Sequence, residues 1–286
     1  MIFKRLNKYF GAFPSGIKKL LNFQGIELII NKLDSGGTYY HSNKTYEEIN
    51  SRLYGLIEEN YRPKIFLDIG ANYGLISIIS SLRFESAKII AVEASKILIP
   101  YIVKNFHLNS IKNYDLLHCI CGAENSKTST FSINPYSSQD SRVKGESSKW
   151  KNQIVETITI NSILETSLPN DPVFIKIDTQ GFEESVFRGA SKFLTTNSNW
   201  IVKSEFGPYW LKSQGTEPKI FLMELVEKYD VAELPATIPL LVKSTSELFQ
   251  NLLKPECIDD FLQHIILLNK DNRGWVDIII RPKTDL

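Results

Sequence analysis

The sequence predicts an α/β protein whose mostly parallel sheet carries helices on both faces. Three observations support this fold class. From residue 64 onward, short apolar strands alternate with segments of helical periodicity, which is the pattern of a parallel sheet. The first strand runs into a glycine-rich turn, and the second ends on a glutamate. In open α/β sheets such features lie at the carboxyl ends of the strands, where ligands bind.

The segment before this alternation is expected to form a helical extension. Residues 15–33 place apolar side chains near helical spacing with lysines between them, and this pattern favours a helix packed on the main domain. A peripheral contact of that helix with a membrane surface, or with a partner protein, is the alternative. Residues 45–60 predict a second helix. We therefore expect an N-terminal helical extension over 1–61 and the main domain over 62–286.

In the main domain, short apolar runs predict strands, and longer runs with helical periodicity predict helices. The expected strands are 64–69, 88–92, 114–120, 128–133, 155–159, 173–178, 200–205, 231–234 and 275–281. The expected helices are 74–82, 95–108, 162–166, 183–194 and 220–229. The last two strands are expected to form a hairpin-like edge. The polar, serine-rich stretch 135–153 is interpreted either as a mobile lid over a substrate or as a solvated insertion.

The composition excludes several classes of protein. The chain has 286 residues, of which 43% are hydrophobic and 23% are charged, so a disordered chain is excluded. The formal net charge of +1 gives no general attraction to nucleic acid, and we expect no nucleic-acid partner. Three cysteines argue against a disulfide framework. No transmembrane segment of about 20 apolar residues and no secretory signal are recognised, so a cytoplasmic protein is expected.

The strongest chemical signal is the sequence FLDIGANYG at Phe66–Gly74. Glycines after a strand let the backbone turn tightly and let a ligand approach the main chain, and the following helix offers free N–H groups at its start. The turn does not follow G-x-G-x-x-G, and a pyrophosphate tolerates the carboxylate of Asp68 poorly. The ammonium and sulfonium of S-adenosylmethionine suit that carboxylate better. We therefore predict that Asp68, Gly70, Asn72 and Gly74 bind S-adenosylmethionine.

A second acidic residue stands at the end of the next strand. Glu93 lies about 20 residues beyond the glycine turn, and a carboxylate there accepts hydrogen bonds from both ribose hydroxyls of an adenosine. The apolar and small residues around it argue against an ordinary surface carboxylate. Because a nicotinamide dinucleotide carries the same ribose, Glu93 alone does not distinguish the two cofactors.

The third signal is the sequence KIDTQGFEE, which begins at Lys176. Lys176 and Asp178 lie two apart on a strand, so both side chains point to the same side. A lysine within an apolar strand needs a carboxylate partner, and Asp178, Glu183 and Glu205 are the candidates. Asp178 and Glu205 are also candidate oxygen ligands of a divalent metal. A metal is not favoured, because no third carboxylate or histidine stands at a suitable spacing, and we assign no metal ligand.

Together these motifs resemble the FkbM family of S-adenosylmethionine-dependent methyltransferases. The resemblance rests on FLDIGANYG, AVEAS, NFHLN, ETITINSIL and KIDTQGFEESVFRGASKFL, followed by a strand that ends at Glu205. It covers roughly residues 65–206. It implies the Rossmann-like class I methyltransferase fold, with a seven-stranded sheet and one antiparallel strand near an edge. It also implies O-methylation, often of a sugar hydroxyl in a glycan or a natural product.

The resemblance also implies roles for individual residues. Those that line the cofactor are Asp68, Gly70, Asn72, Gly74 and Glu93. Those that match the family's K-x-D-x-x-G-x-E signature near the transfer site are Lys176, Asp178, Gly181 and Glu183. One departure is Asn161, where the family usually carries aspartate, and this puts any role assumed for that position in doubt.

The expected mechanism follows from the chemistry of the cofactor. Its sulfonium is already a strong electrophile, so the main task of the protein is to place an acceptor oxygen in line with the methyl group. We expect Asp178 or Glu205 to remove the hydroxyl proton, directly or through a metal or water, with Lys176 fixing the carboxylate. The expected partner is a small-molecule or glycan acceptor. Its identity and the oligomeric state are left open by the sequence.

Weaker candidates for the site lie near or beyond the ends of the matched region. His41 and His264 are candidate bases on the substrate side. The aromatic residues Phe206, Tyr209 and Trp210 are expected either to wall the acceptor pocket or to form a seam of the core.

Three other functions compete with methyl transfer to a small molecule. A nicotinamide-dependent oxidoreductase predicts G-x-G-x-x-G, which is absent from the glycine turn. A nucleic-acid methyltransferase predicts a basic face or an added RNA-binding module, and the balanced charge argues against both. A non-catalytic binding or scaffold protein that keeps the fold is left open by Asn161, although every cofactor-side residue is present. The fold class by itself does not choose among these functions.

Overall fold

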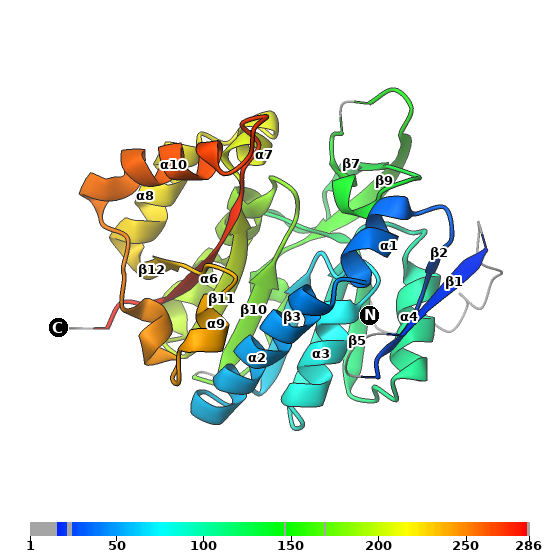
Figure 1. The fold of residues 1–286 in the computed structure, drawn as a ribbon. Helices are drawn as coiled ribbons and strands as arrows, with labels where there is room; N and C mark the ends of the chain where they lie inside the picture. The colour runs from blue at the N-terminus through cyan, green and yellow to red at the C-terminus, as the bar shows by residue number, and fades with distance from the viewer. Residues whose placement is uncertain (1–15, 22–24, 146, 169, 285–286) are drawn as a thin grey trace.

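A seven-stranded sheet lies at the centre of the computed structural model, which describes residues 16–21, 25–145, 147–168 and 170–284 (Figure 1). The strand order is β12-β13-β11-β10-β3-β4-β5. These strands are β3 (Ile65–Ile69), β4 (Lys88–Glu93), β5 (Tyr114–His118), β10 (Val173–Ile177), β11 (Trp200–Phe206), β12 (Tyr229–Glu233) and β13 (Val276–Pro282). β13 runs antiparallel to β11 and β12, and the other neighbouring pairs are parallel. The expected α/β architecture is confirmed, and the sheet is mixed because β13 enters it in the opposite direction.

Helices cover both faces of this sheet, and each face has its own apolar core. One core contains residues of α2 (Lys44–Asn60), α3 (Leu75–Arg83) and α4 (Ile99–Leu108), and the other contains residues of α6 (Glu183–Thr196), α8 (Pro218–Lys228) and α10 (Ile258–Leu267). Shorter helices are α1 (Ser35–His41), α5 (Ile160–Ile163), α7 (Pro208–Ser213) and α9 (Ile238–Leu241). Successive side chains of a strand point to opposite faces, so Phe174 of β10 belongs to the first core and Ile175 to the second.

The helix predicted over residues 45–60 is present as α2. The side chain of Asn43 caps it by accepting a hydrogen bond from the Tyr46 N–H at 3.2 Å. Its buried face brings the ring of Tyr54 to 5.6 Å from the ring of Phe66 in β3. α2 and the sheet therefore share one core, and the division of the chain after residue 61 stays a prediction.

Residues 15–33, predicted as a helix, contain a β-hairpin instead, so the prediction of a helical extension is wrong there. β1 (Ile17–Leu21) pairs antiparallel with β2 (Glu27–Asn31). The alternative of a peripheral membrane contact depended on a helix over residues 15–33, so it is not supported by this structure. Residues 1–15 and 22–24, which belong to the predicted extension, lie outside the described residues. Within the described residues, no helix has the length and apolar character needed to cross a membrane.

Two asparagines, Asn105 in α4 and Asn109 directly after it, explain why this segment is extended. The side-chain amide of Asn105 bonds both backbone groups of Ile29, accepting from its N–H at 2.6 Å and donating to its carbonyl at 3.0 Å. Asn109 bonds both backbone groups of Glu27 in the same way, at 3.1 and 2.7 Å. These side chains supply the partners that a neighbouring strand would give β2. The contact joins distant parts of the chain, so local spacing does not reveal it.

A second, smaller sheet carries the serine-rich stretch (Figure 1). In the order β6-β9-β7-β8 its strands are β6 (Ile120–Cys121), β9 (Lys151–Ile158), β7 (Thr128–Ile133) and β8 (Arg142–Val143). Between β7 and β8 lies the 3₁₀ turn η2 (Ser138–Asp140). The backbone N–H of Ser138 donates to the carboxylate of Asp34, just before α1. The serine-rich stretch is therefore attached to the N-terminal segment.

Candidate active site

The carboxyl ends of the central strands open onto a cavity of about 410 Å³. Its walls come from the turns after these strands, from α1 and α2, from the η2 region and from the segment after α10. The predicted site residues that line it are Gly70, Asn72, Glu93, Lys176, Asp178 and Glu205. Asp68 and Gly74 do not belong to its lining in the described part of the chain. The cavity lies at the sheet edge where ligands bind in open α/β folds.

The glycine turn is shaped by the close approach of two strands. Gly70 has a φ of +79°, and a Cβ on it would lie 1.9 Å from the carbonyl oxygen of Asp178 at the end of β10. The N–H groups of Gly70 and Ala71 both donate to the carbonyl of Val92, each at 3.0 Å. A side chain at position 70 would therefore push β3 away from β10. This glycine serves the contact between two backbones.

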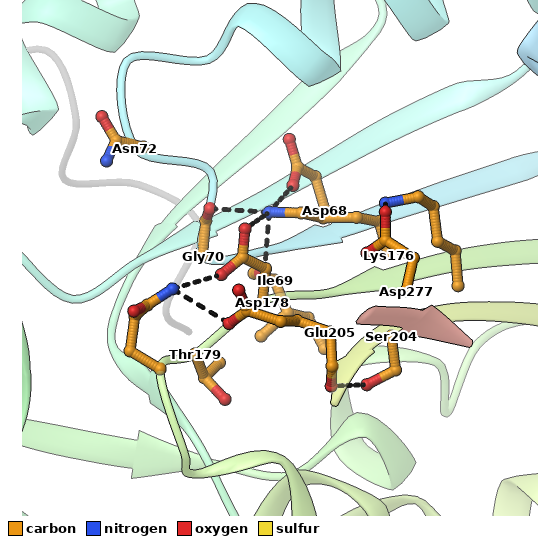
Figure 2. Close-up of polar contacts among 12 residues, drawn as sticks. Asp68, Ile69, Gly70, Asn72, Lys176, Asp178, Thr179, Ser204, Glu205 and Asp277 are labelled. Atoms are coloured by element: carbon orange, nitrogen blue, oxygen red, sulfur yellow. Dashed lines mark hydrogen bonds and ion pairs between the residues drawn. The ribbon is translucent and has the colours of Figure 1, made fainter. Parts of the chain in front are cut away.

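Asp68 and Gly74 lie behind the cavity wall. Asp68 is fully buried; its carboxylate accepts a hydrogen bond from the Ser77 hydroxyl at 2.6 Å and lies 3.4 Å from Nζ of Lys176 (Figure 2). The negative charge predicted to attract a cationic ligand is thus paired within the protein. Gly74, with a φ of +82°, precedes α3, and a Cβ on it would lie 2.7 Å from the ring of Phe106. Both residues support the turn from behind.

Lys176 joins two carboxylates to the glycine turn. Its Nζ donates to the carbonyl of Gly70 at 3.0 Å and lies 3.4 Å from the carboxylates of both Asp68 and Asp178 (Figure 2). Burial by itself would lower the pKa of Lys176, but the two carboxylates outweigh burial and raise it, so the ammonium stays charged. Asp178 is one of the predicted partners. Asp68 was not foreseen, because its place opposite Lys176 depends on the register between β3 and β10.

Glu183 holds the turn that follows β10. One of its carboxylate oxygens accepts hydrogen bonds from the N–H and the hydroxyl of Thr179, each at 2.9 Å, and from the N–H of Gly181 at 3.3 Å. Gly181 has a φ of +102°, and a Cβ on it would lie 2.3 Å from the carbonyl of Trp210. Gly181 and Glu183 of the signature therefore together fix the backbone on both sides of Gln180.

Gln180, which was not among the predicted site residues, links the two predicted catalytic carboxylates. Its Nε2 donates to Asp178 Oδ1 at 3.1 Å and to Glu205 Oε2 at 3.0 Å. Burial tends to raise the pKa of Asp178, but Lys176 and the hydrogen bond from Gln180 outweigh burial and lower it. Burial and the charge of Asp178 raise the pKa of Glu205 well above its usual value. The two neighbouring carboxyl groups therefore differ: the surroundings favour the ionised form of Asp178 and the protonated form of Glu205.

Asp178 and Glu205, the candidate ligands of a metal that the sequence did not favour, are bridged by an amide group. The side-chain nitrogen of Gln180 donates to both Asp178 and Glu205. In the described ranges, no group of three or more histidine, cysteine, aspartate or glutamate side chains is arranged to hold a metal ion.

Glu93 fixes the opposite side of the glycine turn. Its two carboxylate oxygens accept hydrogen bonds from the N–H of Asn72 at 2.8 Å and the N–H of Ser95 at 2.7 Å. Burial raises the pKa of Glu93 to about 7. A carboxylate oxygen can accept more than one hydrogen bond. Glu93, held in this way at the cavity wall, is therefore able to accept hydrogen bonds from the hydroxyl groups of a ligand as well.

The N-terminal segment also reaches the cavity. Nε2 of His41 lies 3.3 Å from Oδ1 of Asn72, and the hydroxyl of Ser138 donates to the same oxygen at 3.2 Å. Burial lowers the pKa of His41 to about 4, so its ring is neutral at pH 7. His264, the other candidate histidine, lies 3.7 Å from the carboxylate of Glu233 and outside the cavity lining. Ser138 lies 66 residues after Asn72, so the sequence did not predict that it approaches the glycine turn.

Aromatic and polar side chains form the outer wall of the cavity. Trp210 and Trp275 line it, and Trp275 is 44% exposed. The guanidinium of Arg273, which also lines the cavity, lies 4.5 Å from the centre of the Tyr209 ring. Of the predicted aromatic cluster, Trp210 therefore reaches the cavity, Tyr209 supports Arg273, and Phe206 is fully buried in the core.

Asn161, the departure from the family pattern, has a structural role away from the cavity. Its side-chain oxygen accepts a hydrogen bond from the N–H of Phe193 in α6 at 2.8 Å. Asn161 does not line the cavity. The departure from the family pattern at Asn161 therefore leaves the residues that line the cavity unchanged.

Comparisons with known proteins agree with these motifs. The family described as Methyltransferase FkbM domain matches residues 68–234, which is more than half of the chain. The chain matches no curated protein. Among solved structures it is similar to precorrin-6y C5,15-methyltransferase from Geobacter metallireducens, at 14% identity over 82% of this chain and 87% of that chain, with a TM-score of 0.41. It is also similar to a putative O-methyltransferase from Klebsiella pneumoniae, at 12% identity over 82% of this chain and 80% of that chain, with a TM-score of 0.44.

Proposed function

The chain belongs to the FkbM methyltransferase family, and on this premise we propose that it transfers the methyl group of S-adenosylmethionine to a hydroxyl oxygen of a sugar-containing acceptor. One observation carries the proposal: Gln180 donates hydrogen bonds to both Asp178 and Glu205 on the cavity wall, where the pKa of Asp178 is lowered by Lys176 and that of Glu205 is raised by burial. Transfer to a hydroxyl releases a proton, so a carboxylate within the cavity has a direct use. This argument applies to a hydroxyl acceptor; transfer to a carbon or to an amine requires other groups in the site.

The residues present fit S-adenosylmethionine. The carboxylate of Glu93 is held by two backbone donors at the end of β4, where it is suited to bind ribose hydroxyls. The turn from Gly70 to Asn72 brings main-chain atoms into the cavity. Glu93 and Asp178 place more negative charge on these walls than Lys176 neutralises, which favours a cationic ligand. When bound, S-adenosylmethionine supplies a methyl group that is electrophilic because it is attached to a sulfonium.

The chain's own residues orient the acceptor hydroxyl and accept its proton. Asp178 orients the acceptor hydroxyl and takes its proton, while Lys176 keeps this carboxylate ionised. Because its pKa is lowered, Asp178 is a weak base, so the proton moves late, when methylation has made the oxygen acidic. Gln180 fixes Asp178 from the other side. The raised pKa of Glu205 favours its protonated form, whose O–H is a hydrogen-bond donor for a second oxygen of the acceptor.

The outer wall supports a sugar as the acceptor. A sugar ring has apolar faces and a polar rim, and the cavity presents both kinds of surface. Trp210 and Trp275 contribute aromatic rings to the lining, and Asn269, Asp271 and Arg273 contribute hydrogen-bonding groups. A few placed polar groups among apolar ones are typical of sites that bind small molecules.

Calorimetry and an acceptor screen test this function. We expect S-adenosylhomocysteine to bind to the purified protein and NAD not to bind in the same buffer. With S-adenosylmethionine, we expect methylation of at least one member of a panel of methyl and aryl glycosides, measured by mass spectrometry, and loss of that product in Asp178→Asn. Absence of S-adenosylhomocysteine binding, or transfer to amines but not to hydroxyls, would refute the proposal.

A further inference from the structure

Two positively charged side chains, Lys176 and Arg273, line the cavity in the described part of the chain. Nζ of Lys176 lies against two carboxylates and the carbonyl of Gly70, so its N–H donors are taken up within the protein. Arg273 lies between α10 and β13, and its side chain is 47% exposed. The proposed reaction uses Lys176 and leaves the charge of Arg273 without a role.

Local contacts fix the backbone at Arg273. Its N–H donates to Oδ1 of Asp271 at 3.1 Å. A Cβ on the next residue, Gly274, would lie 1.8 Å from the carbonyl oxygen of Ile265 in α10, so this segment packs closely against that helix. The fold therefore sets the position of Arg273 before any ligand binds, and a group that is placed in advance loses less entropy on binding.

The guanidinium of Arg273 is oriented by aromatic rings and a carboxylate. Its Cζ lies 4.5 Å from the centre of the Tyr209 ring and 5.9 Å from the centre of the Trp210 ring, distances at which a cation is attracted to an aromatic face. Its Nε lies 3.8 Å from Oδ2 of Asp271. Nη1 and Nη2 donate no hydrogen bond to any described residue. The Nη edge of the guanidinium is therefore available to a ligand.

The carboxylate of Asp271 leaves Arg273 able to bind an anion. The side chains of both partners are about half exposed, so water weakens their attraction, and ion pairs of this kind contribute little. A second guanidinium, that of Arg142 in β8, has its Cζ 4.5 Å from the centre of the Trp210 ring. An anionic ligand beside Trp210 would therefore lie near two guanidinium groups.

Other parts of the cavity disfavour an anion. Glu93, Asp140 and Asp178 also line it, and Glu93 and Asp178 stand where the cofactor and the acceptor hydroxyl are proposed to lie. Because like charges repel, an anionic group on the acceptor is directed towards Arg273. A hydroxyl elsewhere on the same acceptor is then left for Asp178.

We propose that Arg273 selects the acceptor by binding an anionic group on it, a carboxylate or a phosphate, through Nη1 and Nη2. The proposal rests on the proposed function, because the anion belongs to the same acceptor whose hydroxyl meets Asp178. The planar fork of a guanidinium matches two oxygens of either group, so the acceptor is a sugar acid or a sugar phosphate. Arg273 lies outside residues 68–234, so this selection belongs to a segment beyond the matched family region.

Three matched glycosides test the proposal by ligand-observed NMR titration. They are phenyl β-glucoside, which is neutral, phenyl β-glucuronide, which carries a carboxylate, and phenyl β-glucoside 6-phosphate. The protein is first saturated with S-adenosylhomocysteine, and the ionic strength is about 0.15 M, so that distant charges are screened. We expect at least one anionic glycoside to bind at least about tenfold more tightly than the neutral one, the advantage of hydrogen bonds to a charged group. The tighter of the two anionic glycosides identifies the group.

One variant locates the binding, and a matched variant controls for the loss of a positive charge. Arg273→Gln should remove the preference for the anionic glycoside. Arg188→Gln removes an arginine of α6 whose side chain is 69% exposed and which does not line the cavity, so the preference should be retained.

Failure of both anionic glycosides to bind more tightly than the neutral one, a preference that persists in Arg273→Gln, or an equal loss in Arg188→Gln would overturn the proposal. Methylation of neutral glycosides without an anionic preference would leave the proposed function in place and overturn only this inference. If the wild type does not bind S-adenosylhomocysteine, the proposed function is contradicted, and the same titrations without it still decide on Arg273.

Discussion

Replacing Lys176 with methionine removes the charge at the centre of the site, and we expect it to destabilise the fold by about 3–5 kcal/mol. In the wild type its Nζ lies 3.4 Å from the carboxylates of Asp68 and Asp178. At an effective dielectric constant of about 20, one such pair is worth about 5 kcal/mol before desolvation is counted. Asp68 is fully buried, so the substitution leaves it a hydrogen bond from Ser77 and no cation. The side chain of Asp178 is 33% exposed, so water replaces part of what it loses.

A double-mutant cycle distinguishes this buried-charge effect from a simple loss of packing. The free energies of unfolding of the wild type, Lys176→Met, Asp68→Asn and the double variant are measured in guanidinium chloride at pH 7. The double variant buries neither charge, so it should be more stable than Lys176→Met by about 2 kcal/mol or more. A cost below about 1 kcal/mol for Lys176→Met, or a double variant no more stable than it, would refute the reasoning.

The same substitution should change the pH dependence of catalysis. Lys176 lowers the pKa of Asp178, so this pKa rises when the ammonium is removed. The acid limb of kcat/KM should therefore move to higher pH in the double variant of Lys176→Met and Asp68→Asn, relative to Asp68→Asn alone. A pH–rate profile with the acceptor found by the screen measures the shift. An acid limb at the same pH in both proteins would mean that Asp178 is not the group that titrates.

Three further substitutions test the glycine turn, the catalytic carboxylate of Asp178 and the cofactor-side carboxylate of Glu93. A fourth substitution, at Gly25, is the control for the turn. Gly70→Ala should destabilise the fold by more than about 3 kcal/mol, because its Cβ would meet the backbone of β10. Gly25→Ala is the control: Gly25 has a φ of +77°, and among the described residues no atom outside its chain neighbours lies within 4 Å of an added Cβ. It should cost about 1–2 kcal/mol, and equal costs of the two substitutions in urea unfolding would exclude the steric cause. Asp178→Asn should lower kcat about 100- to 10,000-fold with nearly unchanged S-adenosylhomocysteine affinity by calorimetry; an unchanged kcat would exclude it as the base. The pKa of Glu93 is raised from 4.5 to about 7 in the folded protein, so between these pH values the folded state holds a proton that the unfolded state has lost. The unfolding free energy of the wild type relative to Glu93→Gln should then fall by up to about 3 kcal/mol as the pH rises through that window, and a difference independent of pH would contradict the shift.

The sheet was predictable because its signals are local. Apolar runs bounded by turn residues mark the strands, and the glycine turn marks the first crossover. The segment that forms β1 and β2 was mispredicted, because its apolar spacing suits a helix while β2 is held by hydrogen bonds from Asn105 in α4 and Asn109 at its end. Tertiary contacts of this kind override local propensity. The sequence by itself holds no sign that those asparagines face residues 27–31.

The candidate site was predictable in its members more than in its arrangement. Asp68 was interpreted as a ligand for a cation, and the cation it meets is Lys176. That contact depends on which strands are neighbours and in which register, and both are properties of the folded sheet. Gln180 occupies a position that the signature leaves free, so residue type gave no reason to select it. Its hydrogen bonds to Asp178 and Glu205 exist only because β10 and β11 end side by side.

The walls of the cavity that come from α1 and the η2 region are attached to the glycine turn, in part through the carboxylate of Asp34. Asp34, which is 3% exposed, accepts hydrogen bonds from the hydroxyl of Tyr73 at 2.8 Å and from the N–H of Ser138 at 3.2 Å. Tyr73 belongs to the turn itself, while Ser138 and His41 both approach Oδ1 of Asn72 in the same turn. A change in the turn therefore moves the η2 region and α1 together with it. Because residues of these segments also line the cavity, we infer that binding in the turn and the shape of the acceptor site are mechanically coupled.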